Sequence, residues 1–151
     1  MRVLAALVLA LSAFVVRAEV QEVPGWFPES FLEFPQDVKE AAGDGKRLML
    51  YFWQEGCASC RKMKATTFAD PRIVDATRAK FVPVALNVFG ERELVWTDGR
   101  TLREKELARD LGIRGTPTLL FLDENGAEVL RRIGYQPPER FSTLLAEARA
   151  R

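Results

Sequence analysis

The 151-residue sequence contains no histidine, and its only cysteines are Cys57 and Cys60. Without histidine, catalytic triads that need an imidazole, histidine general bases and histidine metal ligands are all excluded. Two cysteines alone do not complete a tetrahedral zinc site, so such a site would need a dimer that contributes four thiolates. We therefore expect one copy of this chain to hold no metal and to need no cofactor.

The sequence has no large excess of either charge, because it contains 22 lysines and arginines and 21 acidic residues. Phosphate binding needs basic residues that cluster on one face, and no such cluster is visible in the sequence. We expect no nucleic-acid partner.

No apolar run reaches the roughly 20 residues that a membrane-spanning helix needs. The longest stretch, Val3–Val16, follows the single charge of Arg2 and precedes small residues that end at Ala18. This pattern predicts a signal peptide over 1–18 that is cleaved after Ala18, and an uncleaved anchor is the alternative. The mature protein is then expected to be soluble, exported and periplasmic.

The remaining 133 residues suffice for one ordinary domain with a sizeable core and are too few for two. We assign residues 19–36 to an N-terminal lead-in and residues 37–151 to the domain. We expect this domain to be a monomer. A surface excursion over residues 89–100 has a turn at Asp98-Gly99, and the sequence assigns no function to it.

The hydrophobic pattern alternates between strands and helices, with a hairpin near the end of the chain. The predicted strands are Arg47–Trp53, Phe81–Val88 with Pro83 at its start, a strand that follows Pro117 and runs to Leu122, and Glu128–Ile133. The predicted helices are Pro35–Ala42, Cys57–Phe68, Pro71–Lys80 capped by Asp70, one from a Thr101/Glu104 capping box to Gly112, and one that begins at Pro137-Pro138. This order predicts an α/β sandwich of three layers, with a mixed sheet covered by helices on both faces.

The two cysteines form a Cys-x-x-Cys motif between a predicted strand and a predicted helix. A structural disulfide is the simpler interpretation in an exported protein, but so small a loop removes little entropy from the unfolded chain. At a helix N-terminus, the Cys57 thiolate is stabilised by free backbone N–H groups and by the helix dipole, which lowers its pKa. We therefore expect a redox pair, in which Cys57 attacks a substrate disulfide and Cys60, buried one turn later, resolves the mixed disulfide.

The order of strand, Cys-x-x-Cys, helix, Gly115-Thr116-Pro117-Thr118, strand and Asn125-Gly126 resembles the thioredoxin superfamily. Within it, the sequence around Cys57 resembles exported thioredoxin-like proteins such as SoxW-type thioredoxins and the C-terminal domain of the DsbD transmembrane reductase. The resemblance implies a thioredoxin-like fold and a cis Thr116–Pro117 bond beside the disulfide. It also implies that Thr116 and Pro117 bind substrate.

Several positions depart from the family pattern. Gly56 replaces the tryptophan before the first cysteine, and Tyr51 replaces the buried aspartate that helps to deprotonate the second thiol. We expect Glu55 or a water molecule to take over this proton transfer, although Glu55 is equally suited to be a solvated turn residue. Trp53 is the tryptophan best placed for a substrate contact, with core packing as the alternative.

The function expected from these features is that of an exported thiol-disulfide oxidoreductase that reduces protein disulfides. A membrane-embedded thiol reductant would then be its electron donor. The residues between the cysteines do not strongly stabilise the reduced form, so we place the pair nearer to thioredoxin, at about −270 mV, than to DsbA, at about −120 mV. Two alternatives stay open: a redox-inert thioredoxin-fold module that binds peptides or acts as a chaperone, and a disulfide oxidase or isomerase.

Overall fold

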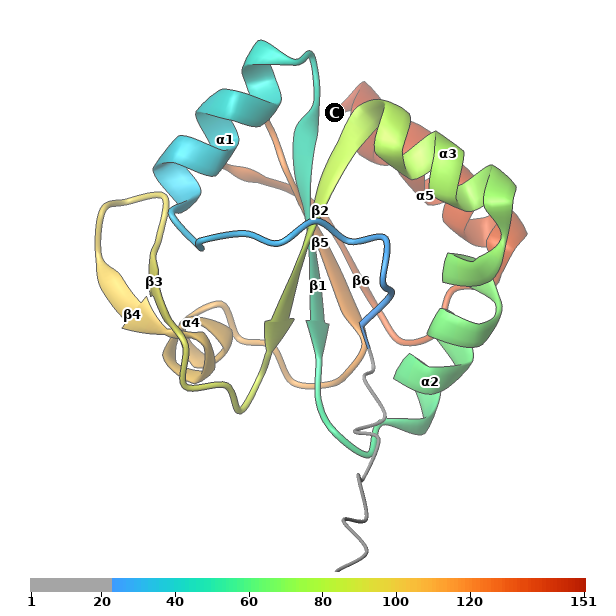
Figure 1. The fold of residues 1–151 in the computed structure, drawn as a ribbon, viewed down its shortest axis with the longest axis horizontal. Coiled ribbons are helices and arrows are strands. Elements are labelled where there is room, and N and C mark those ends of the chain that lie inside the picture. The colour runs from blue at the N-terminus through green and yellow to red at the C-terminus, as the bar shows by residue number, and fades with distance from the viewer. Residues whose placement is uncertain (1–22) are drawn as a thin grey trace, which may run out of the picture.

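A computed structural model describes residues 23–151 of the chain, and the signal peptide expected over residues 1–18 lies outside these residues. A four-stranded sheet forms the centre of the molecule (Figure 1). Its strands lie in the order β2-β1-β5-β6. They are β1 (Arg47–Trp53), β2 (Phe81–Asn87), β5 (Thr118–Leu122) and β6 (Glu128–Ile133).

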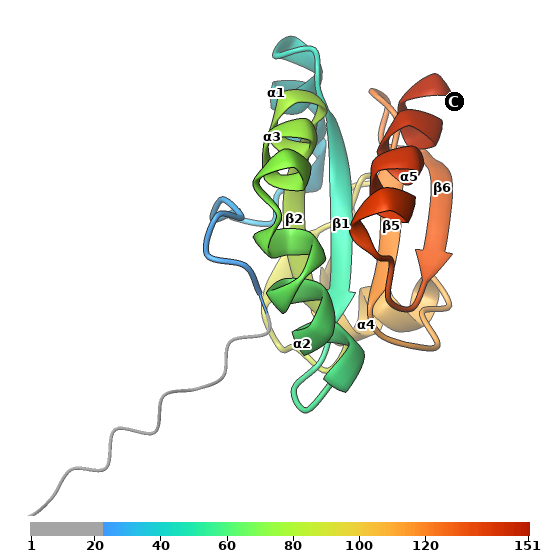
Figure 2. The ribbon, with the colours of Figure 1, turned by 90° about the vertical axis from the view of Figure 1, so that its right-hand side faces the viewer.

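Helices cover both faces of this sheet, which confirms the expected three-layer α/β sandwich (Figures 1 and 2). One face is covered by α1 (Phe34–Gly43) and α4 (Glu104–Asp110), and the other by α2 (Ala58–Ala65), the short 3-10 helix η1 (Thr67–Ala69), α3 (Pro71–Lys80) and α5 (Pro138–Ala150). In the described part of the chain, no helix has both the length and the apolar character to cross a membrane.

Strand β1 is buried on both sides, as its nearly continuous apolar sequence predicts. Leu48, Leu50 and Phe52 face the core under α1 and α4. Met49 and Tyr51 face the core under α2, α3 and α5, which also contains both cysteines. The central strand therefore divides the apolar interior into two cores and leads directly into the Cys-x-x-Cys motif.

The strand directions bring four chain segments together at one end of the sheet. Strands β1 and β2 are parallel with Trp53 opposite Asn87, whereas β5 runs antiparallel to both β1 and β6. As a result, Trp53, Asn87 and Ile133 end their strands where Thr118 begins its own strand. We call this the exit end of the sheet, and Cys57 follows β1 there.

The chain after β2 forms a small hairpin around the expected Asp98-Gly99 turn, with strands β3 (Glu93–Val95) and β4 (Thr101–Arg103). Its Trp96 is buried, and the centroid of its ring lies 5.0 Å from that of Phe34 in α1. The hairpin is therefore packed against the domain.

The predicted Thr101/Glu104 capping box is wrong. Thr101 lies in β4, and α4 begins at Glu104, where the backbone N–H of Arg103 donates to Glu106 at 2.8 Å. The side chain of Glu104 is buried and instead accepts a hydrogen bond from Asn87 N–H at the end of β2. Thr101 and Glu104 therefore match the capping-box sequence pattern without capping the helix.

The helix predicted over residues 57–68 is interrupted. Helix α2 ends at Ala65, because the Thr66 hydroxyl donates to the Lys62 carbonyl and the chain then turns into η1. The buried Thr67 hydroxyl donates to the Gln136 carbonyl at 2.6 Å and fixes this bend to the loop before α5. The predicted Asp70 cap of α3 is confirmed, since its side chain accepts from Arg72 N–H.

Pro83 occupies the third position of β2, not its start. Strand β2 lies at the edge of the sheet, where one side of the backbone has no partner strand. An edge strand tolerates a proline in its interior for that reason.

Candidate active site

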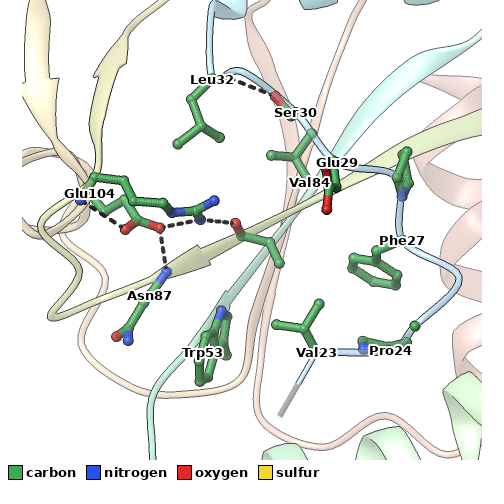
Figure 3. Close-up of a pocket in the computed structure, with 14 residues that line it drawn as sticks. Val23, Pro24, Phe27, Glu29, Ser30, Leu32, Trp53, Val84, Asn87 and Glu104 are labelled. Atoms are coloured by element: carbon green, nitrogen blue, oxygen red, sulfur yellow. Dashed lines mark hydrogen bonds and ion pairs between the residues drawn. The ribbon is translucent and has the colours of Figure 1, made fainter. Parts of the chain in front are cut away.

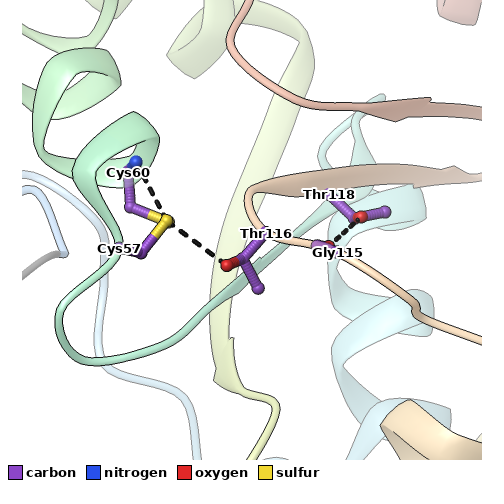
Figure 4. Close-up of a disulfide and its surroundings, with 5 residues drawn as sticks. All are labelled: Cys57, Cys60, Gly115, Thr116 and Thr118. Carbon is purple, nitrogen blue, oxygen red and sulfur yellow. Dashed lines mark hydrogen bonds between the residues drawn. A yellow bond between two sulfur atoms is a disulfide. The ribbon is translucent and has the colours of Figure 1, made fainter.

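The two cysteines are joined by a disulfide at the N-terminus of α2 (Figure 4). Cys57 is the N-cap residue of this helix, and its sulfur accepts a hydrogen bond from the backbone N–H of Cys60 at 3.1 Å. Cys57 retains 7% of its surface exposed, whereas Cys60 retains none. Cys57 is therefore the cysteine that a partner can reach, and Cys60 lies behind it.

The loop before β5 lies against this disulfide. The Thr116–Pro117 peptide bond is cis, as the resemblance implies, and the Thr116 hydroxyl donates to the Cys57 sulfur at 3.3 Å (Figure 4). The Pro117 carbonyl accepts from Gly134 N–H at 2.7 Å, and the Gly115 carbonyl accepts from the Thr118 hydroxyl at 2.7 Å. These two bonds hold Thr116 in place beside the sulfur.

The environment on the inner side of the disulfide is aromatic. Tyr51 is fully buried, and its ring packs edge-on against Phe27 and Phe68 at centroid distances of 5.9 and 5.2 Å. Glu55 is exposed in the turn between β1 and α2. Tyr51, which stands where the family has a buried aspartate, is therefore part of an aromatic core.

Trp53 lines a cavity between the segment of residues 23–32 and the edge of β2 (Figure 3). The cavity has a volume of about 640 Å³ and is lined by Trp53 but not by Cys57. The indole Nε1 is buried and has no hydrogen-bond partner among the described residues. Trp53 also packs against the core that contains both cysteines.

One residue near the site escaped the sequence analysis. Ile133, the last residue of β6, lies close enough to the Thr116 loop that a Cβ atom on Gly115 would be 3.6 Å from its Cγ2 atom. Its side chain is nevertheless 60% exposed. The sequence signal that could have identified Ile133 is its position as an apolar residue at the end of a predicted strand, just before Gly134-Tyr135. The described part of the chain contains no group of three or more Cys, Asp or Glu residues able to hold a metal ion.

Comparison with known proteins places this geometry in a family. Residues 34–149 match the family model described as a thioredoxin-like domain. The chain is 29% identical over 121 residues to the thiol:disulfide interchange protein DsbD of Ralstonia nicotianae, covering 80% of this chain and 18% of that protein. It is 30% identical over 117 residues to DsbD of Escherichia coli strain K12, covering 76% of this chain and 19% of that protein. The chain thus spans about a fifth of the length of these relatives.

Solved structures agree with this assignment. A thioredoxin from Thermus thermophilus is 30% identical, with a TM-score of 0.59, and the match covers 76% of this chain and 82% of that one. The oxidised C-terminal domain of DsbD from Neisseria meningitidis shares the fold at 19% identity, with a TM-score of 0.56 and coverage of 76% and 88%. By the family model, its relatives and its own fold, this chain belongs to the thioredoxin-like domain family.

Proposed function

We propose that this protein is an exported thiol-disulfide oxidoreductase that reduces protein disulfides through Cys57 and Cys60. The observation that supports this proposal best is the position of the Cys57–Cys60 disulfide, which lies at a helix N-terminus beside the Thr116–Pro117 loop. Its relatives named thiol:disulfide interchange protein also support this chemistry. Export rests on the signal peptide expected over residues 1–18.

In the first step, the Cys57 thiolate of the reduced protein attacks one sulfur of a substrate disulfide. A bond forms between Cys57 and that sulfur, the substrate S–S bond breaks, and the second substrate sulfur leaves as a thiolate that takes up a proton. Cys60 then loses its proton and attacks the Cys57 sulfur, which releases the first substrate sulfur as a second thiolate. The substrate has gained two electrons, and the protein has formed its disulfide.

The order of attack follows from access and electrostatics. Cys57 is the more exposed cysteine, and its sulfur accepts hydrogen bonds from Cys60 N–H at 3.1 Å and from the Thr116 hydroxyl at 3.3 Å. Hydrogen bonds and the N-terminal end of α2 stabilise negative charge on this sulfur more than on the neutral thiol. Cys60 is fully buried and accessible only to its neighbour.

Substrate binding is assigned to Thr116 and Pro117, which lie beside the reactive sulfur, with the exposed Ile133 next to them. For Trp53 we propose a contact through the cavity that it lines, on the β2 side of the Cys57 turn. For Glu55 we propose proton exchange with solvent at the mouth of the site, because its carboxylate is exposed in the turn before Cys57.

A dithiol in a membrane protein is the proposed electron donor, because an exported protein cannot draw on cytosolic thiols. This donor reduces the Cys57–Cys60 bridge by the same exchange in reverse, and its own two thiols become a disulfide. The protein therefore requires no cofactor.

Reduction of insulin tests the enzymatic assignment. Wild-type protein with dithiothreitol should accelerate the precipitation of insulin chains, and Cys57→Ser should not exceed the rate of dithiothreitol alone. Equal rates for wild type and Cys57→Ser would reject the assignment in favour of a binding module. The direction is tested by equilibration with glutathione buffers, where a potential above about −150 mV would indicate an oxidase or isomerase.

A further inference from the structure

One aromatic side chain at the exit end of the sheet has no role in the chemistry above. In the described part of the chain, the large apolar side chains that are mostly exposed are Phe31, Phe89 and Ile133. Phe89 is 71% exposed and lies two residues after the end of β2. It belongs to the excursion to which the sequence assigned no function.

Phe89 and Ile133 lie on opposite sides of the redox site. The backbone N–H of Val88, next to Phe89, donates to the Trp53 carbonyl at 2.9 Å, so the loop after β2 runs beside the turn that leads to Cys57. Ile133 ends β6 at the other edge of the sheet. Three strand spacings separate β2 from β6, which is about 14 Å, or about four residues of an extended chain.

Hydrogen bonds fix the loop that presents Phe89. Its own backbone N–H donates to the Asn87 side chain at 2.9 Å, and Gly90 N–H donates to the Asn87 carbonyl at 2.8 Å. The Gly90 carbonyl in turn accepts from Lys105 N–H at 3.1 Å. Phe89 thus sits on a closed turn bonded to β1 on one side and α4 on the other.

A buried carboxylate, that of Glu104, is bonded to Asn87 at the start of this turn (Figure 3). Glu104 is 2% exposed and accepts from Asn87 N–H at 3.0 Å and from the Arg92 guanidinium at 2.6 Å. Gly90 packs so closely on this carboxylate that a Cβ atom there would overlap it. A buried carboxylate destabilises a fold unless its oxygens are hydrogen-bonded or paired with a cation. The bonds of Glu104 meet this requirement, and they hold in place a loop whose aromatic side chain is exposed to solvent.

We infer that Phe89 is a docking residue for the protein that exchanges a disulfide with Cys57, and this inference rests on the proposed function. The partner is a polypeptide that lies in an extended conformation across the exit end and places an apolar side chain on Phe89 when its sulfur reaches Cys57. Continuity with the redox site identifies this occupant, because Val88, the neighbour of Phe89, is bonded to Trp53 where the turn to Cys57 begins. A fixed loop also loses little entropy on binding, and aromatic side chains supply much of the energy of protein contacts.

The test compares protein and small-molecule disulfides in single turnovers of the reduced protein. Phe89→Ser should lower the second-order rate constant for insulin about fivefold to twentyfold, as expected for the loss of an aromatic contact, and Phe89→Leu should retain most of it. The rate with 5,5′-dithiobis(2-nitrobenzoic acid), which is too small to span to Phe89, should not change. Phe31→Ser is the matched control, since Phe31 is 97% exposed but precedes α1.

A peptide series makes the contact specific. Each peptide has one cysteine in a mixed disulfide with thionitrobenzoate and either leucine or serine at one position within four residues of it. At one of these positions, the leucine peptide should react faster than the serine peptide with wild type, and the two peptides should react equally fast with Phe89→Ser. The docking role would be overturned if Phe89→Ser lost the same rate with every substrate, or lost none with insulin. It would also be overturned if leucine had no effect at any position, or if Phe89→Ser changed only the self-association of the protein. Failure of the wild type to react with either disulfide would instead reject the proposed function.

Discussion

The Thr116 hydroxyl donates a hydrogen bond to the Cys57 sulfur at 3.3 Å, although 59 residues separate the two in the chain. The contact exists because β5 follows Thr116 at the same end of the sheet where β1 leads into Cys57. It places a neutral donor, not a charged group, beside the reactive sulfur. We expect this donor to stabilise the thiolate of the reduced protein.

Thr116→Val should therefore slow the reaction of reduced Cys57 with iodoacetamide at pH 7 about threefold to tenfold, because valine keeps the shape of threonine and removes the donor. Thr116→Ser retains a hydroxyl and should react within a factor of about two of wild type. A midpoint of the pH–rate profile that is identical in Thr116→Val and wild type would show that the hydroxyl does not act on the thiolate.

Cys60→Ser should trap the reaction at its first intermediate. Without the buried thiol, Cys57 still attacks a substrate disulfide, but the mixed disulfide has no internal nucleophile to resolve it. Mass spectrometry after incubation with insulin should find one insulin chain attached to Cys57. Complete turnover by Cys60→Ser would contradict the two-step mechanism.

Glu104→Gln should lower the free energy of unfolding by about 2 kcal/mol, because glutamine keeps the size of the side chain but weakens its bonds to Arg92 and the Asn87 N–H. Urea denaturation measures this change. Glu106→Gln is the half-buried comparison and should cost much less, since its carboxylate accepts from Arg103 N–H at the start of α4 and is not fully buried. Equal losses would show that burial of Glu104 contributes nothing.

The stability of the fold depends on pH through the carboxylate of Asp70. Hydrogen bonding by the Arg72 side chain, above all, holds the pKa of Asp70 below its usual value. A lowered pKa means that the ionised form favours the folded state, so this stabilisation is present above pH about 3.9 and is lost as the pH falls through the folded-state pKa. Asp70→Asn should reduce the loss in Tm between pH 5 and pH 2 relative to wild type, and 1 M salt should shrink the difference. A wild-type Tm that falls no more steeply than that of Asp70→Asn would contradict this.

Much of the fold can be predicted from local sequence because its signals are local. The apolar run Arg47–Trp53 matches β1 at both ends, and the Asp123–Gly126 turn sets the β5–β6 hairpin. The strand order that joins these elements depends on contacts between distant residues, which local sequence signals do not contain.

The candidate site divides in the same way. Cys57 and Cys60 are visible as a motif, whereas the positions of Phe89 and Ile133 at the exit end depend on the register of β2 and β6. The burial of Glu104 follows from the hairpin that precedes it, since β4 extends through Arg103 and displaces the predicted cap. An exposed apolar side chain has no signature in sequence, because the same residue type fills the core.

Differential alkylation of the folded, reduced protein tests the central claim most directly. Brief treatment with iodoacetamide at pH 7, followed by denaturation, a second isotopic label and peptide mass spectrometry, assigns each sulfur a rate. Cys57 should take the first label and Cys60 almost entirely the second, since only Cys57 has exposed surface. First labelling of Cys60, or of neither cysteine, would contradict a reachable thiolate at Cys57 with its partner behind it.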